Sequence, residues 1–454
     1  LDLAWGLLAR VRSERRPQAL VLHGGAGVGK SRLATWIAER AHEVGSALTF
    51  SARHDRQPGP GLGLVPMLER SLQLIGLDDR ALGARLEAGG RHTGTLDPQI
   101  LEARLALIRP ELSQLRLVSA RERHVVLLRW LRQLGRSLLE APSEPRAVVL
   151  VLDDLQWGPE ALDFARFVLD ESLPILLIAT VRDDALEPRV AQGLSALEAH
   201  DRCTRRALEA LDPTARRVLV RQLLGLSGEL ADEVEVRTAG NPLFAVELVG
   251  DLVERGVLEL SEGGFRLGRG ERLRLPDDLF QVWGPRVEAL VEWRGPQGEL
   301  ALELAATLGQ QVRKSEWRGL CAELGVELET TRALREELAR RGLIQPSPQG
   351  FAFAHGILVE ALRRHAGEAG RLLRHHARCA AWLEAHAPHE VERIGRHHLQ
   401  AERWDQALAP LAQAAGQLRD RGEFVSCRLV LDRRQAALDA LGVEDLDLRQ
   451  AEGW

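Results

Sequence analysis

The run from Gly24 to Ser31 constrains the fold of this chain more than any other feature. It reads Gly-Gly-Ala-Gly-Val-Gly-Lys-Ser and matches the pattern G-x-x-x-x-G-K-[ST] at every fixed position. An apolar run at 19–22 precedes it, and apolar residues at helical spacing, Leu33, Ile37 and Ala41, follow it. The pattern therefore predicts a buried parallel strand, a glycine-rich loop and a helix, the context in which such loops bind phosphate.

Each residue type in the loop suits a nucleotide phosphate chain. Glycines let backbone N–H groups turn inward around phosphate oxygens, and the positive end of the following helix adds to the attraction. We expect Lys30 to reach the β and γ phosphates and the Ser31 hydroxyl to ligate Mg²⁺. No N-K-x-D stretch, which would indicate guanine, occurs, so the expected cofactors are ATP or ADP with Mg²⁺. The predicted nucleotide-binding residues in this region are Gly24, Gly25, Ala26, Gly27, Val28, Gly29, Lys30, Ser31 and Arg32.

Two aspartates end another strongly apolar run. Residues 147–152 are all Ala, Val or Leu, and Asp153 and Asp154 follow them directly. A strand that ends in acids, in a chain with a phosphate-binding loop, predicts that Asp153 holds Mg²⁺ through water and that Asp154 orients or deprotonates the attacking water. The alternative is a pair of surface aspartates at a strand end.

Arg182 lies just past a further apolar run, 175–179. The carboxyl edge of a parallel sheet faces the bound ligand in α/β folds, so a guanidinium there is placed to contact the γ-phosphate. The alternative is a surface arginine paired with one of the two aspartates that follow it. The predicted catalytic residues are thus Lys30, Asp154 and Arg182, and the predicted metal ligands are Ser31 and Asp153.

The first part of the chain alternates strand-like and helical patterns. Besides the runs already described, residues 47–51 have the pattern of a strand, and a helix is expected from Pro159 to Glu171. Residues 58–146 are mostly helical in pattern, with a break expected at 88–98. Strands that alternate with helices predict a parallel sheet covered on both faces, the α/β P-loop NTPase fold.

Helical patterns dominate after residue 205. A hairpin is expected within Leu258–Leu275, and a second hairpin, between 343–344 and 351–353, follows short helices in the order of a winged-helix domain. Residues 370–442 are helical throughout, with spacings that fit a TPR-like repeat. The predicted domains are an ATPase core at 1–207, a helical lid at 208–275, a winged-helix domain at 276–366 and a TPR-like helical region at 367–454.

Composition limits the classes of partner. The 454-residue chain has a formal net charge of -5, which gives no electrostatic footprint for wholesale binding of nucleic acid or membranes. Its four cysteines are scattered and form no CxxC pair, which suits the reducing cytoplasm. The chain begins at Leu1, inside an apparent helical pattern, so we expect it to be a piece of a longer polypeptide.

A late group of histidines invites a metal interpretation. His375, His376, His386, His389, His397 and His398 fall within a short stretch. No H-E-x-x-H motif and no Cys/His finger spacing accompanies them. We therefore interpret them as solvated or interface histidines on helices.

Together these motifs resemble the signal-transduction ATPases with numerous domains, the STAND class of AAA-related P-loop ATPases, and above all the Orc1-like ATPase domain of large bacterial regulators. Two of the matching pieces best distinguish this class from other P-loop proteins: Leu155–Trp157, after the acidic pair, and Gly240–Phe244. A generic P-loop protein has neither. The usual V-G-R-E stretch before the first helix, which helps hold adenine in the family, is missing. The matching pieces are His23–Ser31, Leu152–Trp157, Ala179–Arg182, Gly240–Phe244 and Phe351–His355.

The resemblance implies further site residues. Pro242 resembles the proline that packs near the nucleotide base at a helix start in this class. Arg182 resembles the arginine that senses the γ-phosphate. His355 resembles a winged-helix histidine that reads the ADP phosphates and locks the closed form in some members; a capped or core histidine is the alternative. The implied fold is of the ASCE or AAA-like type, with an all-α lid, a winged-helix domain and TPR-like repeats after it.

The resemblance also implies a function. A chain of this class is an ATP-binding, slowly hydrolysing signalling switch within a larger bacterial regulator associated with a kinase, a cyclase or a transcription factor. Its helical repeats would bind a protein or small-ligand signal, its output would come from a domain outside residues 1–454, and ATP could drive oligomerisation. Neither nucleic acid nor a membrane is an expected partner of this segment. The alternatives are an oligomeric AAA+ remodelling or DNA-loading ATPase, and a scaffold that holds ADP without hydrolysing ATP.

Overall fold

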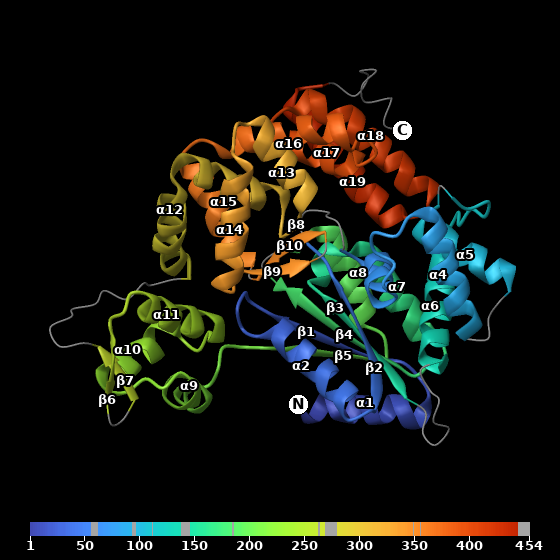
Figure 1. Cartoon of the computed structure of the whole chain (residues 1–454). Coiled ribbons are helices and arrows are strands. Elements are labelled where there is room, and N and C mark those ends of the chain that lie inside the picture. Colours follow the sequence, from blue (N-terminus) through green and yellow to red (C-terminus); the bar gives the residue numbers. More distant parts are fainter. Residues whose placement is uncertain are drawn as a thin grey trace. The chain divides into compact units, whose positions relative to one another are not determined.

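The chain forms two compact units (Figure 1). The first comprises Leu1–His23, Ser31–Arg206 and Leu383–Trp454, and the second comprises Gly24–Lys30 and Ala207–Trp382. The computed structural model describes residues 1–55, 62–92, 97–110, 112–137, 146–183, 186–261, 264–267, 279–347, 349–354 and 356–443. His355, predicted to read the nucleotide phosphates, lies outside the described residues. The division into four domains stays a prediction.

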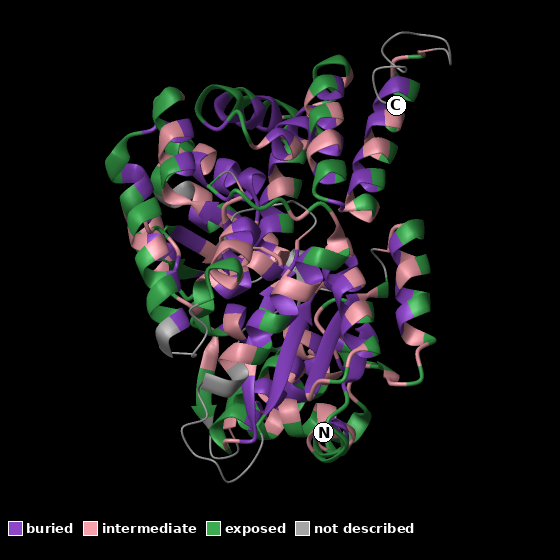
Figure 2. Cartoon of the chain, turned by 90° about the vertical axis from the view of Figure 1, so that its right-hand side faces the viewer, coloured by how far each residue is buried: buried purple, intermediate pink, exposed green. Residues whose placement is uncertain are grey.

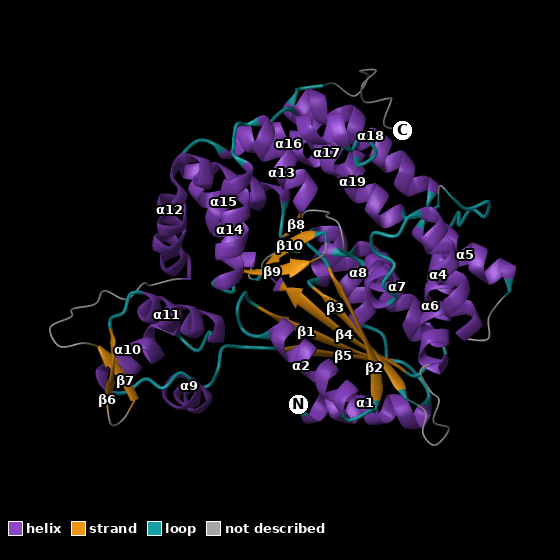
Figure 3. Ribbon diagram, in the orientation of Figure 1, coloured by secondary structure: helices purple, strands orange, loops and turns teal. Residues whose placement is uncertain are grey.

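A five-stranded parallel sheet forms the core of the first unit, and its helices and strands are drawn in Figure 3. Its pairings include β2 with β3 and β3 with β4, both parallel. The strands lie in the order β2-β3-β4-β1-β5, with bounds β1 (Gln18–Gly24), β2 (Ala47–Arg53), β3 (Ala147–Asp153), β4 (Ile175–Arg182) and β5 (Cys203–Ala207).

Burial explains why the central strands read as continuous apolar runs. Every residue of β1 and β3 is buried, and successive side chains point to opposite faces of a sheet, so both faces are covered (Figure 2). The predicted α/β P-loop fold is confirmed. The edge strand β5 was not predicted, because its sequence Cys-Thr-Arg-Arg-Ala is polar and its last three residues are exposed, as suits a sheet edge.

The structure has helices in the stretches 58–146 and 159–171, as predicted, and a further helix, α8, that was not predicted. Helix α4 continues through Gly89 and Gly90 to His92, and α5 begins at Pro98, so the break expected at 88–98 begins later than predicted. Each glycine costs roughly 1 kcal/mol relative to alanine in a helix interior, but Leu82 and Leu86 of the same helix are buried in the main core and offset that cost. The bounds are α1 (Asp2–Glu14), α2 (Lys30–Glu43), α3 (Leu64–Ser71), α4 (Asp79–His92), α5 (Pro98–Ile108), α6 (Ala120–Ser137), α7 (Pro159–Asp170) and α8 (Pro188–Glu198).

The C-terminal part is helical, as predicted for residues 370–442. Buried residues recur on α18 at helical spacing, at Ala407, Leu411, Ala414 and Leu418, and pack against α19. Leu429 of α19 joins the main core beside the sheet. The bounds are α16 (Leu372–His386), α17 (Val391–Gln400), α18 (Trp404–Asp420) and α19 (Phe424–Ala440).

A cluster of one arginine and two glutamates joins these C-terminal helices to the α/β core. Arg123 of α6 lies 3.2 Å from Glu423, just before α19, and 3.6 Å from Glu160 of α7. Burial, and then the charge of Glu160, raises the pKa of Glu423 to about 8. This carboxyl group therefore binds a proton more tightly in the folded chain than in the unfolded one.

Glu423→Gln is expected to flatten the pH dependence of stability. Because the folded pKa of Glu423 is raised from 4.5 to about 8, its contribution is fully present below the unfolded pKa and is lost as the pH rises through the folded pKa. A neutral amide has no such loss. Urea unfolding between roughly pH 5 and pH 8.5 should therefore give a shallower decline in the variant than in wild type. Glu39→Gln, an exposed acid on α2, is the control; equal slopes for Glu423→Gln and wild type would contradict the assignment.

The second unit begins with a small helical part and a hairpin. Strands β6 and β7 pair antiparallel, which confirms the hairpin expected within Leu258–Leu275 over its described residues. Leu248 and Leu252 of α11 form part of the core of this region. The elements are α9 (Pro213–Arg217), a π-helical turn (Val218–Leu223), α10 (Gly228–Thr238), α11 (Pro242–Glu254), β6 (Leu258–Ser261) and β7 (Gly264–Leu267).

Four helices and a three-stranded sheet follow in the same unit. The sheet has the order β8-β10-β9, with β10 antiparallel to both neighbours, and the predicted hairpin at 343–353 is confirmed. Gly295 kinks the long helix α12 with a φ of 60°. The elements are α12 (Leu279–Leu308), β8 (Gln311–Arg313), α13 (Lys314–Glu323), α14 (Leu328–Arg340), β9 (Ile344–Ser347), β10 (Gly350–Phe353) and α15 (Gly356–Glu368).

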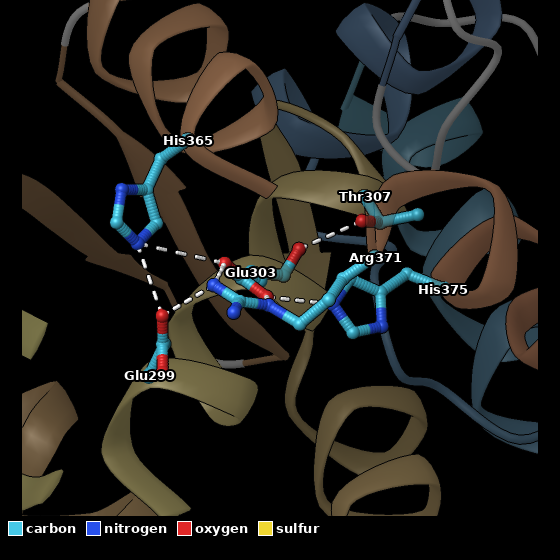
Figure 4. A network of polar contacts seen from close by, with 6 residues as sticks. All are labelled: Glu299, Glu303, Thr307, His365, Arg371 and His375. Atoms are coloured by element: carbon cyan, nitrogen blue, oxygen red, sulfur yellow. Dashed lines mark hydrogen bonds and ion pairs between the residues drawn. The ribbon is translucent and has the colours of Figure 1, made fainter. Parts of the chain in front are cut away.

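One buried carboxylate ties three helical segments of this unit together (Figure 4). Glu303 of α12 accepts hydrogen bonds from Arg371, at 2.7 and 3.1 Å, and contacts His375 Nε2 of α16 at 2.7 Å. Arg371 also binds Glu299, which contacts His365 Nε2 of α15 at 3.0 Å. Burial alone would raise the pKa of Glu303, but the hydrogen bonds and charges of His375 and Arg371 outweigh it and hold the pKa below its usual value.

Of the late histidines, which were interpreted as solvated or interface groups, His386 and His389 are exposed. His375, His376, His397 and His398 are all buried. His365, Glu299 and Glu303 lie close enough together to hold a metal ion. The guanidinium of Arg371, however, already binds both carboxylates. The network is therefore an internal ion-pair cluster.

Candidate active site at the glycine loop and the acidic strand end

The glycine loop leaves the carboxyl end of β1 and leads into α2. Gly27 and Gly29 have φ of 80° and 98°, in the region that favours glycine. A Cβ on Gly27 would lie 2.6 Å from Asn241 Oδ1, so the loop also needs glycine there for space. Lys30 is buried, and its Nζ donates to the carbonyl oxygens of Gly24 and Gly25 at 2.8 and 2.7 Å. The Lys30 side chain therefore folds back onto its own loop. In the first turn of α2, Ser31 is half-buried and Arg32 is exposed.

The start of α11 contacts this loop within the second unit. Asn241 caps the helix through a hydrogen bond from the Phe244 N–H to its Oδ1, at 3.1 Å. Its Nδ2 donates to the Ala26 carbonyl at 3.0 Å, and the Leu243 N–H donates to the Gly27 carbonyl at 3.3 Å. Pro242 stands at the first position of the helix, where its missing N–H has no cost. Asn241 was missed as a site residue, although an Asn-Pro pair before an apolar run is a helix-start signal that could have found it.

Asp153 is the last residue of β3 and is buried. Its Oδ1 accepts a hydrogen bond from Thr180 Oγ1 at 2.7 Å, and its Oδ2 lies 3.4 Å from Arg53 Nε. Oxygen ligands of this kind are what Mg²⁺ prefers, and Ser31 would add a hydroxyl oxygen, so the predicted pair of ligands fits the ion chemically. Thr180 and Arg53 were missed, because β2 and β4 bring them to Asp153 from distant parts of the chain.

Asp154 follows in a left-handed conformation, with a φ of 55°. Its N–H donates to Thr180 Oγ1 at 2.9 Å, and its Oδ1 accepts from Gln156 Nε2 at 3.0 Å. Burial, and then the charge of Asp153, raises the pKa of Asp154. A carboxylate whose pKa is raised is a better proton acceptor than an ordinary surface aspartate.

Arg182 ends β4, the strand next to β3 in the sheet. Its N–H donates to Gln156 Oε1 at 3.1 Å, so one glutamine contacts both Asp154 and Arg182. The neighbouring Asp183 binds His23 Nδ1 at 2.7 Å, and His23 is the residue immediately before the glycine loop. Asp153, Asp154 and Arg182 therefore lie at the carboxyl ends of the neighbouring strands β3 and β4. Strand β1, which leads into the glycine loop, lies beside β4 in the same sheet.

Over the residues that the structure describes, no helix is both long enough and apolar enough to cross a membrane.

The sequence matches two family models. The model of the AAA ATPase domain matches residues 6–178. A model described as a domain of unknown function (DUF8739) matches residues 213–266, which include α10 and α11. No curated protein matches the chain.

Solved structures similar to this chain are distant. The Walker-type ATPase PABY2304 of Pyrococcus abyssi is 17% identical, with 80% of this chain and 95% of that chain covered and a TM-score of 0.31. Cdc6p from Pyrobaculum aerophilum is 12% identical, with 80% and 92% covered and a TM-score of 0.31. AMPPCP-bound DnaA from Aquifex aeolicus is 13% identical, with 82% and 90% covered and a TM-score of 0.29. Likenesses this distant carry no argument about function.

Residues 6–178 thus match the AAA ATPase domain in sequence, and the parallel sheet, the glycine loop and the acidic strand end give this part of the chain the fold of an AAA-like P-loop ATPase.

Proposed function

We propose that this chain is the ATP-binding, slowly hydrolysing switch module of a larger bacterial regulator. The observation that carries the proposal is the acidic pair at the end of β3, a buried Asp153 followed by a half-buried Asp154, in a chain whose Lys30 donates hydrogen bonds to carbonyls of its own glycine loop. The loop suits the phosphates, and the acidic pair suits the metal and the water.

Each residue has a distinct part in the proposed hydrolysis. The loop N–H groups and Lys30 bind the phosphates, and Arg182 stabilises the charge on the γ-phosphate. Ser31 and Asp153 would hold Mg²⁺, which neutralises phosphate charge when bound. Asp154, whose pKa is raised by burial, orients the water and receives its proton.

The switch follows from contacts that a nucleotide would change. Asn241 and Leu243 hydrogen-bond to the backbone of the glycine loop, so a ligand in that loop alters the environment at the start of α11. Only such differential contacts let ATP and ADP favour different arrangements of the chain. Pro242 is assigned to the nucleotide base and His355 to the ADP phosphates, by resemblance to the STAND class.

The remaining parts fit a regulatory module of that class. The order of α12–α15 with the sheet β8-β10-β9 suits a winged-helix domain, and α16–α19 suit the start of a TPR-like array that binds a protein or small-ligand signal. The output would come from a further domain, and the cytoplasm is the proposed location. We assign no nucleic-acid partner to this segment.

Asp154→Asn is expected to keep nucleotide binding and to lower ATP turnover by at least about 100-fold, because the amide cannot accept the proton of the water. Bound nucleotide is measured by extraction from the purified protein, and turnover by phosphate release under single-turnover conditions. Asp420→Asn, on an exposed part of α18, is the matched control and should behave as wild type.

The other functions predict different results in the same assays. Fast turnover that rises with protein concentration would favour an oligomeric AAA+ machine. ADP that survives purification, with no hydrolysis by wild type, would favour a scaffold. Failure to bind either ATP or ADP would overturn the proposal.

A further inference from the structure

A single glutamine joins the acidic strand end to the strand that carries Arg182. Gln156 is 2% exposed and lies in the 3₁₀ turn η1 (Leu155–Trp157), directly after the acidic pair. Both ends of its amide are used. Its Nε2 donates to Asp154 Oδ1 at 3.0 Å, and its Oε1 accepts the N–H of Arg182 at 3.1 Å.

The surrounding backbone fixes where this amide can reach. The turn closes through hydrogen bonds from the Trp157 N–H to the Asp154 carbonyl, at 3.0 Å, and from the Gly158 N–H to the Leu155 carbonyl, at 2.9 Å. Leu155 is 1% exposed and anchors the turn in the main core. Because the turn is fixed and the buried amide is hydrogen-bonded at both ends, the side chain holds its two partners at a defined separation.

The direction of each hydrogen bond matters for the chemistry. An amide N–H on Oδ1 orients the Asp154 carboxylate and leaves its Oδ2 outside this hydrogen bond. The amide oxygen meanwhile holds the last peptide of β4, from which the Arg182 side chain projects. Thr180 completes the link, because its hydroxyl contacts both Asp153 Oδ1 and the Asp154 N–H.

We propose that Gln156 is a positioning residue for ATP hydrolysis, which keeps the Asp154 carboxylate and the backbone of Arg182 at one fixed separation through the two ends of its amide. The inference rests on the proposed function, because it assigns Gln156 to the same reaction. It concerns the hydrolytic step, since the two ends of the Gln156 amide bind the Asp154 carboxylate and the Arg182 backbone.

Gln156→Leu tests the inference, because leucine keeps the approximate volume and removes both hydrogen bonds. We expect kcat to fall by about 10- to 100-fold, the scale of a misplaced catalytic group, with KM and the ATP dissociation constant within about 3-fold of wild type. Gln156→Glu keeps an oxygen for the Arg182 N–H but sets a carboxylate against Asp154, so its kcat should fall at least as far. Gln133→Leu, which removes a glutamine of α6 that is bound to Arg104 of α5, is the control.

A double-mutant cycle separates positioning from a merely structural role. If Gln156 acts through Asp154, Gln156→Leu should cause less than a 3-fold further loss in single-turnover rate in an Asp154→Asn background, far from additive. Additive losses, an unchanged kcat, or an equal fall in ATP affinity and kcat would each overturn the inference while leaving the proposed function standing. A wild-type chain that binds ATP but never hydrolyses it would instead overturn the proposed function, and the inference with it.

Discussion

Lys30→Ala is expected to lower the affinity of the chain for ATP by at least about 100-fold, the largest functional effect of any single change. Lys30 is buried, and its ammonium group already lies within hydrogen-bond distance of the Gly24 and Gly25 carbonyls. Removing it takes away the one mobile cation of the loop and also two hydrogen bonds that support the loop. Fluorescent ATP binding, followed by competition with unlabelled ATP and ADP, measures the loss.

The chain offers an unusually clean control for this change. Lys30 and Lys314 are its two lysines, and Lys314 begins α13 in another part of the chain. Lys314→Ala should bind ATP as wild type does. Equal affinity of Lys30→Ala and Lys314→Ala would show that the glycine loop does not bind the phosphates, and the proposed function would fail with it.

Arg371→Met is expected to give the largest loss of stability outside the apolar core, about 3 kcal/mol in the free energy of unfolding. The change leaves the Glu303 carboxylate, whose side chain has 0% exposure, without its main counter-charge. We take the lower end of the range for a broken buried ion pair because Arg371 itself is 34% exposed and because His375 remains in contact with Glu303. Urea unfolding followed by tryptophan fluorescence measures the loss, since Trp283 and Trp317 of the same unit are fully buried.

Two further variants test whether the stability lost in Arg371→Met comes from leaving the Glu303 carboxylate buried without a counter-charge. Arg332→Met breaks an arginine–glutamate pair in which both side chains are exposed, and it should have little or no effect. Adding Glu303→Gln to Arg371→Met should recover part of the stability, because no charge is then left buried without a partner. A loss in Arg371→Met no larger than that in Arg332→Met would mean that the network of Figure 4 does not hold its helices together.

The sequence could predict the parts of the fold that depend on short stretches of consecutive residues, such as apolar runs and motifs. The strands β1, β3 and β4 read as apolar runs because they are buried on both faces, and the glycine loop has a complete motif. Strand β5 was missed because its sequence, Cys-Thr-Arg-Arg-Ala, contains no such apolar run. Helix α4 was cut short because its glycines are tolerated only through tertiary packing of its leucines, which no local pattern records.

The same distinction separates the predicted site residues from those that were missed. Asp153, Asp154 and Arg182 follow apolar runs, so their place at the sheet edge could be predicted. Gln156 and Thr180 act through hydrogen bonds to residues on another strand, and those pairings depend on the order of the strands. The burial of His375 likewise depends on Glu303, which lies 72 residues away in the chain.

The left-handed backbone of Asp154 restricts which residues can replace it. Its φ of 55° and ψ of 48° are readily adopted by glycine and asparagine and are strained for β-branched residues. Selection for a folded protein would therefore retain Gly and Asn there and reject Val, Ile and Thr. Selection for hydrolysis would reject Gly and Asn as well. In a lineage that has abandoned catalysis but kept the domain as a binding scaffold, this residue should drift first to Asn or Gly, so its identity would mark the loss of enzymatic turnover.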